Sequence, residues 1–488
     1  MKIAFVSSEM VPFAKTGGLA DVTGTLSREI LLLGHELVAF LPRYKMVNLS
    51  TVKTETLFED IEIKIGSDTE CGKVLKHVTP EGMTVYLIEH KQFFHRDELY
   101  GTVAGDFPDN DKRFIFFQRA VLETLKRLKW KPEIIHCHDW HTGLIPVYLK
   151  TLYTKDAFFQ KTRTVFTIHN LAYQGNFPPD SMPLTGLGWE HFTMDRLEFY
   201  GKLSFMKGGI LDADRVTTVS ERYAREIQTQ EFGCGLEGVL VGQHEKLLGI
   251  VNGIDPKEWE PGTDKGMTAN FTAENLDGKT RCKAVLQKEN GLDIDPKAPL
   301  VGVISRLVDQ KGIDILIESM ERMFQMGAQL ILLGTGEEKY HRILREVGRK
   351  KRGQSSIHIL FDTAMAKKIY AGSDMILVPS YYEPCGLSQM IALRYGTIPV
   401  VRATGGLADT VRSFDPKSGQ GNGFTFDDYN SGALLWGLER AIEVYNDPKI
   451  WNQLVKNAMA CDFSWTASAK KYVQLYEASV RRPIVGLK

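Results

Sequence analysis

The sequence has few cysteines, and they are scattered. Only six occur among 488 residues, and none forms a Cys-x-x-Cys pair. A disulfide framework needs patterned cysteines and an oxidising compartment, so this composition favours a reducing cytosol.

The chain also lacks an excess of charge of either sign. Lysine plus arginine and aspartate plus glutamate both total 60, and no long block of one sign occurs. This balance provides no general field to attract nucleic acid or an anionic membrane. We therefore expect neither as a partner, so local charges must hold any anionic ligand.

Long apolar runs are missing as well. No stretch approaches the roughly 20 apolar residues that a membrane-spanning helix needs. The opening residues MKIAFVSSEM are apolar over only a few positions, which is too short for a signal-peptide core. With the cysteine pattern, these absences predict a cytoplasmic location.

What remains is the composition of a large globular protein. Hydrophobic residues make up 43% of the chain and charged residues 25%, as in soluble domains. A chain of 488 residues is too long for one ordinary core, so we expect two large domains.

The first half alternates apolar runs with amphipathic stretches. KIAFVSS, at residues 2–8, is typical of a buried parallel strand, and a helix-period stretch separates it from a second run at residues 35–42. Right-handed crossovers build this β-α-β order into a doubly wound sheet. Further strand candidates lie at residues 133–140, 163–170 and 215–220.

The same order restarts in the second half, at PLVGVISRL. After residues 299–307, strand candidates follow at 328–336, 355–361, 374–380 and 397–402. We predict an α/β protein of two Rossmann-like domains, residues 1–252 and 253–463, with a helix in residues 464–488 that packs back toward the first domain. The boundary lies in a segment dense in Gly, Pro and Asp, residues 251–262. One larger α/β sheet is the alternative.

Ligands of open α/β sheets bind beyond the carboxyl ends of the strands, so the loops there are the candidate sites. After the first strand, Lys15, Gly17 and Gly18 combine a cation with backbone that a ligand can approach closely. The string TGGLAD occurs there, from Thr16, and again after a strand of the second half, from Thr404.

Two cations follow the strand at residues 299–307. Arg306 and Lys311 suit the oxygens of a diphosphate, although a solvated surface pair is an equal reading of them alone. Gly334 opens a glycine turn after the next strand, which suits a nucleotide but is weak on its own.

Histidines crowd the segment EIIHCHDWHTG, residues 133–143, and suggest a metal. Alternate residues of a strand point to opposite faces, and no carboxylate cluster completes a site, so we predict none. The strand end instead delivers Asp139 and Trp140, whose indole could stack on a sugar. His169 and Asn170 end the next strand, with a structural histidine as the alternative.

A lone carboxylate, Glu383, stands in YYEPCGLSQ before a helix-period run. It could bind sugar hydroxyls, or it could be a helix-terminal charge worth ~0.3–1 kcal/mol. Local chemistry leaves these two readings open.

The strings KTGGLADV, HDWHTG, TIHNLAYQG, NGIDPKEWEP, SRLVDQKG, EPCGLSQ and TGGLADTV occur here in the order seen in bacterial glycogen synthases and plant starch synthases. The resemblance covers essentially the whole chain. It implies the GT-B fold, two Rossmann-like domains around a deep cleft, with the acceptor glucan on the N-terminal side and the nucleotide sugar on the C-terminal side. It implies glucosyl transfer from ADP-glucose to the non-reducing end of an α-1,4-glucan such as glycogen or maltodextrin, with retention and without metal or cofactor.

The resemblance also implies roles for particular residues. Arg306, Lys311 and Lys15 would hold the donor diphosphate, His169 would lie beside the transferred glucose, and Glu383 would bind its hydroxyls. Of these, Glu383, His169, Arg306 and Lys311 form the predicted catalytic set. The predicted substrate-binding set is Lys15, Gly17, Gly18, Asp21, Asp139, Trp140, Asn170, Gly334, Cys385, Gly386, Leu387, Ser388, Thr404, Gly405 and Gly406. Ser388 stands where many members have Thr, which keeps the hydroxyl.

Several alternatives stay open at this stage. The donor could be UDP-glucose, the protein could be a glucan phosphorylase with pyridoxal phosphate, or it could bind glucan without turning it over. Retention could proceed through a covalent glycosyl-enzyme or through departure and attack on one face of the sugar. We favour the same-face course.

Overall fold

The computed structural model describes residues 1–102 and 104–481, and the chain divides into two compact units. Unit 1 comprises Met1–Val219, Ala224–Ile250 and the C-terminal helix from Trp465 on, and unit 2 comprises Ser220–Tyr223 and Val251–Ser464. Of the segment expected at 464–488, residues 482–488 lie outside the described residues.

Unit 1 is built on a nine-stranded sheet. Its strand order is β14-β13-β9-β8-β1-β2-β5-β4-β3, parallel from β14 to β5 and antiparallel from β5 to β3. The chain runs outward from β1 to β2 and, in the other direction, from β8 to β9, so the order reverses between β1 and β8. The bounds are β1 (Lys2–Val6), β2 (Glu36–Pro42), β3 (Glu55–Ile65), β4 (Asp68–Val78), β5 (Thr84–Glu89), β8 (Ile134–His138), β9 (Arg163–Ile168), β13 (Arg215–Thr218) and β14 (Leu247–Gly249).

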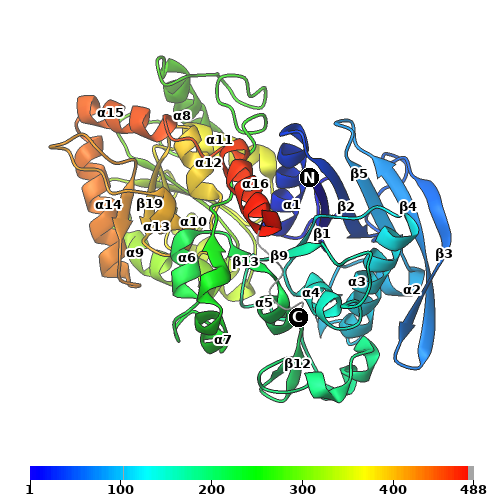
Figure 1. Cartoon of the computed structure of the whole chain (residues 1–488). Helices are drawn as coiled ribbons and strands as arrows, with labels where there is room; N and C mark the ends of the chain where they lie inside the picture. The colour runs from blue at the N-terminus through cyan, green and yellow to red at the C-terminus, as the bar shows by residue number, and fades with distance from the viewer. Residues whose placement is uncertain (103, 482–488) are drawn as a thin grey trace. The chain divides into compact units, whose positions relative to one another are not determined.

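The helices of unit 1 fall into two groups. The C-terminal helix α16 (Trp465–Arg481) packs against α1 (Gly18–Leu32), as the red and dark blue helices of Figure 1 show. In the second group, α4 (Leu144–Lys150) contacts both α3 (Asn110–Arg127) and α5 (Phe205–Asp212). Right-handed crossovers in opposite directions place α1 and α4 on opposite faces of the sheet.

Short elements complete the first half of the chain. They are α2 (Lys91–Phe94), β6 (Gly101–Thr102), β7 (Gly105–Asp106), η1 (Trp140–Thr142), β10 (Asn176–Phe177), η2 (Pro179–Ser181), η3 (Pro183–Thr185), η4 (Trp189–His191), β11 (Glu198–Phe199), β12 (Lys202–Ser204), α6 (Glu221–Glu226), α7 (Glu237–Gly242) and η5 (His244–Lys246). Strands β10, β12 and β11 form a small separate sheet.

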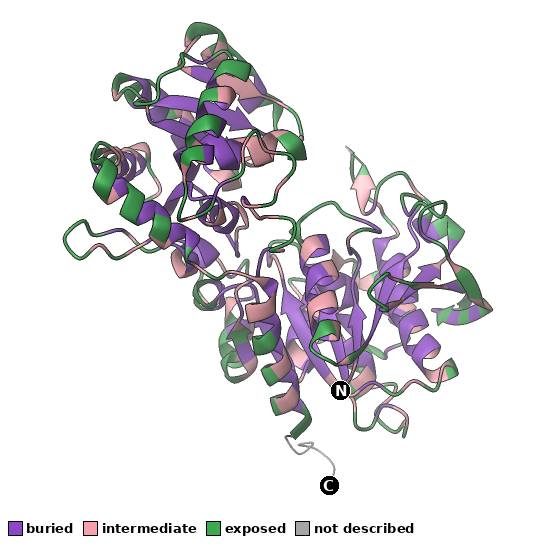
Figure 2. Cartoon of the chain, turned by 90° about the horizontal axis from the view of Figure 1, so that it is seen from above, coloured by how far each residue is buried: buried purple, intermediate pink, exposed green. Residues whose placement is uncertain are grey.

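Unit 2 is a parallel sheet of six strands in the order β17-β16-β15-β18-β19-β20. The bounds are β15 (Leu300–Ile304), β16 (Gln329–Leu333), β17 (Ser355–His358), β18 (Met375–Val378), β19 (Ile398–Arg402) and β20 (Phe424–Phe426). Here the order reverses between β15 and β18. Figure 2 shows the central strands of both sheets buried, as the continuous apolar runs predict.

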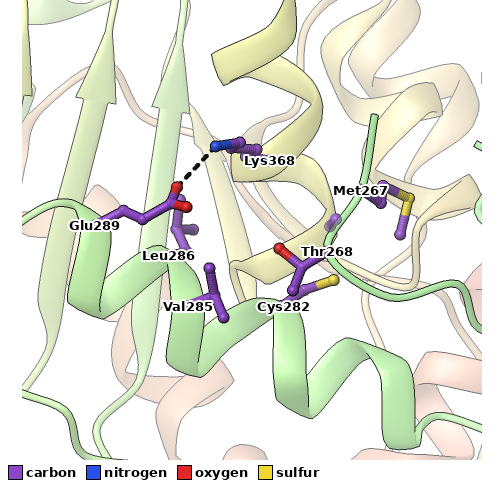
Figure 3. A pocket seen from close by; sticks show the side chains of 8 residues that line it. Met267, Thr268, Cys282, Val285, Leu286, Glu289 and Lys368 are labelled. Carbon is purple, nitrogen blue, oxygen red and sulfur yellow. Dashed lines mark hydrogen bonds and ion pairs between the residues drawn. The ribbon is translucent and has the colours of Figure 1, made fainter. Parts of the chain in front are cut away.

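Helices alternate with the strands of unit 2. They are α8 (Asp277–Glu289), η6 (Asp309–Lys311), α9 (Ile313–Gln325), α10 (Glu338–Lys350), α11 (Thr363–Gly372), α12 (Ser388–Arg394), α13 (Gly405–Thr410), α14 (Ser431–Tyr445) and α15 (Pro448–Met459). Helices α8 and α11 pack together, and Glu289 and Lys368 join them by an ion pair of 2.8 Å (Figure 3). The cavity between these two helices has only about 10 Å³, which is room for one water molecule.

The two separate sheets show that the alternative of one larger sheet is wrong. The strands expected from continuous apolar runs are present. The antiparallel pair β3 and β4 was not expected, because charged residues alternate with apolar ones along both strands and one face is exposed. Among the described residues, no helix has both the length and the apolar character to cross a bilayer.

Candidate functional site

In unit 2, the predicted site residues gather at one edge of the sheet. Arg306 and Lys311 follow β15, Gly334 follows β16, the segment from Glu383 to Ser388 follows β18, and Thr404 to Gly406 follow β19. These four strands are parallel neighbours, so their carboxyl ends lie along the same edge. The reversal of strand order between β15 and β18 opens a crevice there in folds of this kind.

Glu383 is the buried carboxylate of this edge. Its side chain is 10% exposed, and its Oε2 accepts hydrogen bonds from Lys311 Nζ at 2.5 Å and from Ser380 Oγ at 3.1 Å. Within the described parts of the chain, Oε1 of Glu383 has no hydrogen-bond partner, yet it is not among the fully buried unpartnered atoms. One carboxylate oxygen is therefore fixed by the protein while the other is open to a ligand.

Glu383 also lies five residues before the first residue of α12, so it is not a charge in the first turn of that helix. The reading of Glu383 as a helix-terminal charge therefore has no support in this geometry.

Arg306 is the exposed cation of the same edge. Its guanidinium donates to Gln310 Oε1 at 3.3 Å, and Gln310 Nε2 donates to the carbonyl of Tyr382 at 3.2 Å. Through Gln310, the loop after β15 is tied to the loop that carries Glu383. Arg306, Lys311 and Glu383 thus form one constellation of two cations and one carboxylate.

The second TGGLAD string supports this constellation by close packing. A Cβ atom on Gly405 would lie 1.9 Å from the carbonyl oxygen of Glu383, and one on Gly406 would lie 2.1 Å from that of Cys385. Gly406 N–H also donates to the Glu383 carbonyl at 3.1 Å. Gly334 is similar, because its Cβ would lie 2.0 Å from the Ser305 carbonyl.

The rest of the loop after β18 leads into helix α12. Burial raises the pKa of the Cys385 thiol to about 12, so this side chain is a neutral thiol. Gly386 has a φ of +75°, a value that favours glycine, and Leu387 precedes the first helical residue, Ser388. Ser388 Oγ donates to the carbonyl of Ile304, at 3.4 Å.

In unit 1, a second set of predicted residues also lies at a reversal of strand order. Lys15 to Asp21 follow β1, Asp139 and Trp140 follow β8, and His169 and Asn170 follow β9. Lys15 Nζ pairs with Asp21 at 2.7 Å, and both side chains are largely accessible, at 47% and 33%. Asn170 Oδ1 accepts from Ala172 N–H and so shapes its own turn.

Glu9 holds the loop that contains Lys15, and sequence reasoning missed it. It is 4% exposed and accepts hydrogen bonds from Thr16 N–H, Thr16 Oγ1, Gly17 N–H and the Tyr100 hydroxyl, at 2.5, 2.7, 3.2 and 2.8 Å. An acid directly after a buried strand was the available signal. A Cβ on Gly17 or Gly18 meets no atom within 4 Å, so this first TGGLAD string is open where the second is packed.

Asp139 joins the loops after β8 and β9. It has a φ of +56°, and its Oδ1 accepts the backbone N–H of His169 at 2.8 Å. Burial is the main cause that raises the pKa of Asp139 to about 7.

The indole of Trp140, by contrast, is 8% exposed. It stacks on His141 with a centroid distance of 3.9 Å, and a Cβ on Gly175 would lie 2.4 Å from its ring. This packing gives the indole a supporting role in unit 1 and leaves it no open face for a sugar.

The proton of His169 can be placed from its neighbours. His138 Nδ1 and His169 Nε2 are 3.0 Å apart, and burial lowers the pKa of His169 to about 3 and that of His138 well below its usual value, so both rings are neutral. His138 Nε2 is buried and has no hydrogen-bond partner among the residues that the structure describes. A buried lone pair costs less than a buried unpaired N–H, so we assign the proton of His138 to Nδ1. His169 Nε2 then accepts, and its Nδ1–H remains to donate to a ligand.

The neighbouring histidines are engaged in the core. His136 lies 2.7 Å from the Tyr476 hydroxyl of α16 and 2.6 Å from Thr167 Oγ1. In the parts of the chain that the structure describes, no group of three His, Cys, Asp or Glu side chains is arranged to hold a metal ion.

Phe361 is a second residue that sequence reasoning missed. It follows β17, at the same edge as Arg306 and Glu383, and it is 81% exposed. A large apolar ring this exposed is unusual for a structural residue and suits a planar ligand. The only signal for Phe361 in the sequence was an aromatic residue that follows a predicted strand.

Comparisons with known proteins agree over the whole chain. Residues 2–242 match the family described as starch synthase catalytic domain, and residues 286–459 match the glycosyl transferases group 1 family. The glycogen synthase of Geotalea daltonii is 49% identical over 98% of both chains, and that of Koribacter versatilis is 45% identical over 99% of this chain and 100% of its own length.

A solved structure is also similar over nearly the whole chain. The chain is similar to the catalytic domain of starch synthase IV from Arabidopsis thaliana bound to ADP and acarbose, with a TM-score of 0.90, 36% identity and coverage of 98% and 99% of the two chains. The sucrose-phosphate synthase of Thermosynechococcus elongatus, at 18% identity and a TM-score of 0.59, shows a shared fold only.

Proposed function

The chain belongs to the glycogen and starch synthase family of glycosyltransferases with the GT-B fold, and we propose that it transfers glucose from ADP-glucose to the non-reducing end of an α-1,4-glucan with retention of anomeric configuration. The observation that carries this proposal is the constellation of Arg306, Lys311 and Glu383 at the strand-order reversal of unit 2. The relative with ADP and acarbose bound supports both halves of the reaction, a nucleotide and a glucan-like sugar.

The cations of unit 2 fit the donor's diphosphate. Arg306 is exposed and offers a planar fork of donors, and Lys311 adds a point charge. As the bond from the anomeric carbon to phosphate breaks, negative charge grows on the departing diphosphate, and both cations stabilise it. We therefore assign the donor side to unit 2, and the exposed ring of Phe361 is available to stack on the nucleobase.

Glu383 and His169 are proposed to bind the transferred glucose. The open Oε1 of Glu383 accepts hydrogen bonds from sugar hydroxyls, and its charge opposes the positive charge that develops at the ring. His169 Nδ1–H donates to an oxygen of the sugar. Both groups are fixed by a second partner, Lys311 and His138 respectively, so little reorganisation is needed during the reaction.

Retention is proposed to occur on one face of the sugar. The bond from the anomeric carbon to the phosphate oxygen breaks, a bond from that carbon to the acceptor oxygen forms, and the acceptor's proton passes to the departing phosphate. A covalent intermediate would instead require a protein nucleophile beneath the anomeric carbon. Lys15, Gly17, Gly18, Asp21, Asp139 and Asn170 remain proposed substrate-binding residues of unit 1, which we assign to the acceptor side.

The deciding experiment compares nucleotide release from two donors with maltodextrin as acceptor. We expect kcat/KM for ADP-glucose to exceed that for UDP-glucose at least tenfold, which corresponds to about 1.4 kcal/mol. Equal use of both donors, or a preference for UDP-glucose, would contradict the proposed donor. Glucan binding without nucleotide release from either donor would show a binding protein and contradict the proposed activity.

A further inference from the structure

A second basic hollow lies in unit 2, at the other end of the sheet from Arg306 and Glu383. It has a volume of about 580 Å³, within the range of small-ligand sites, and we call it the arginine hollow. Its lining residues are Asn290, Gly291, Arg345, Gly348, Arg349, Arg352, Ser355, Ser356 and Ile357. Ser355 is the first residue of β17, whereas Phe361 and Arg306 follow the ends of their strands.

Three arginines converge on the arginine hollow from one helix and the turn after it. Arg345 and Arg349 are four residues apart on α10 and so share one face of that helix. The chain then reverses, because Gln354 and Ser355 N–H both donate to the carbonyl of Lys351, and this turn carries Arg352 to the same hollow.

The charge of the arginine hollow is largely unbalanced. Arg345 forms an exposed pair with Glu338 at 3.3 Å, whereas Arg349 and Arg352 make no hydrogen bond or ion pair with the described residues. No carboxylate is among the lining residues in the described chain. Of the nearby acids, Glu346 is paired with Lys350, and the carboxylate of Asp293 lies against Gly353. Arg349 and Lys350, in the last turn of α10, complement the helix dipole. That effect does not account for the position of Arg352 in the hollow, because Arg352 lies beyond the last helical residue.

An uncharged backbone donor also lines the arginine hollow. Strand β17 is an edge strand. The carbonyls of Gln354, just before it, and of His358 face β16, where they accept from the N–H groups of Leu330 and Gly334. The alternation of a strand therefore turns the N–H of Ile357 outward, away from β16. Ser355 and Ser356 also line the hollow, but the Ser355 hydroxyl donates to the carbonyl of Lys351 at 3.2 Å and Ser356 Oγ lies 3.0 Å from His358 Nε2.

From these features we propose that the arginine hollow is a second ligand site that binds a small phosphate-bearing anion. Guanidinium forks match phosphate oxygens in geometry and charge, and the outward N–H of Ile357 adds an uncharged donor. The site is distinct from the donor site, because the 13 residues of α10 separate them by about 20 Å. Neither the reaction nor its proposed residues require this hollow.

The test is calorimetric titration of the full chain with inorganic pyrophosphate and, separately, with a hexose monophosphate. Because Arg306 and Lys311 would also bind such anions, the titrations use an Arg306→Gln/Lys311→Gln variant as the starting protein. Adding Arg349→Gln and Arg352→Gln should weaken binding of the tighter anion at least tenfold. The matched control adds Arg342→Gln and Lys449→Gln, which remove the same charge from unit 2 outside the lining, leave the Lys350–Glu346 pair intact and should change affinity less than threefold.

Three outcomes would overturn the proposal. They are the absence of binding of either anion once Arg306 and Lys311 are replaced, equal weakening by the control pair, and unchanged affinity after loss of Arg349 and Arg352. Thermal unfolding of each variant without anion verifies the fold. The tighter of the two probes tells whether the site takes a free diphosphate or a phosphorylated sugar.

Discussion

Replacing Glu383 with glutamine tests whether its negative charge acts in catalysis or only stabilises the fold. Glutamine keeps the size of the side chain and one carbonyl oxygen for Ser380, so the loop after β18 can keep its course. The variant loses the negative charge that we propose to face the sugar through Oε1. It also leaves Lys311, whose side chain is 16% exposed, without its counter-charge.

Two magnitudes follow from this geometry. Loss of a preorganised charge at the reacting centre should lower kcat on the order of 10²-fold, about 2.7 kcal/mol of transition-state stabilisation. An uncompensated Lys311 should lower the free energy of unfolding by up to about 3 kcal/mol, the low end for a buried pair, because Lys311 retains some contact with water. The assays are steady-state nucleotide release and urea unfolding.

The same strand provides a matched control at its other end. Asp374 precedes β18 and pairs with Lys283 at 2.7 Å, with side chains 12% and 7% exposed. Asp374→Asn should therefore lower stability by a similar amount while kcat of the folded protein stays within about twofold. A near-normal kcat for Glu383→Gln, or an equal loss of kcat in Asp374→Asn, would refute the catalytic role of Glu383.

Three further predictions concern stability, positioning and pH. Gly405→Ala should lower the free energy of unfolding by about 1–3 kcal/mol, because its Cβ meets the neighbouring loop. Gly18→Ala should leave the free energy of unfolding unchanged or slightly raised. Equal effects of the two substitutions in urea unfolding would contradict the packing difference. His138→Leu removes the hydrogen-bond donor to His169 and should lower kcat/KM about tenfold, whereas His138→Asn, whose amide N–H can replace that donor, should retain most activity. NMR of the His169 ring nitrogens should show the proton on Nδ1 in the native protein. A proton on Nε2 would disprove the assignment. The folded-state pKa of His169 is about 3, against 6.5 for the exposed group, so below pH 6.5 the unfolded chain binds a proton that the folded chain does not. The free energy of unfolding should therefore fall as the pH falls below 6.5, by up to about 1.4 kcal/mol per pH unit. Between about pH 7 and about pH 5.5, urea unfolding should show a smaller loss of stability in His169→Phe than in the native protein, and an identical loss would contradict this cause.

Much of the architecture was predictable because its signals are local. Strands buried on both faces read as continuous apolar runs, and the loops after them are where parallel sheets bind ligands. Lys15 and Arg306 were selected on that basis, and the structure places both in loops that follow a strand. Glu383 was assigned to the sugar through the family resemblance, and it lies in the loop after β18. The β3–β4 hairpin escaped detection because its exposed face is charged, and alternating strands have a weaker signal than continuous ones.

Contacts between distant loops were not predictable in the same way. The two TGGLAD strings are identical in sequence, yet one is open and the other packs against the Glu383 loop. Trp140 was expected to offer a face to a sugar, but Gly175 and His141 cover its ring. Neither difference depends on the residues next to these positions in the chain.

The sequence by itself determined the two sheets, the cations and carboxylates available at their carboxyl ends, and the family to which the chain belongs. The tertiary structure alone decided which of those groups meet. Strand order in a sheet is set by non-local pairing, and the reversal between β15 and β18 is what puts Lys311 within 2.5 Å of Glu383, 72 residues away. Periodicity reports the face on which a side chain is buried, whereas the identity of its neighbour across the sheet depends on how the whole chain is wound.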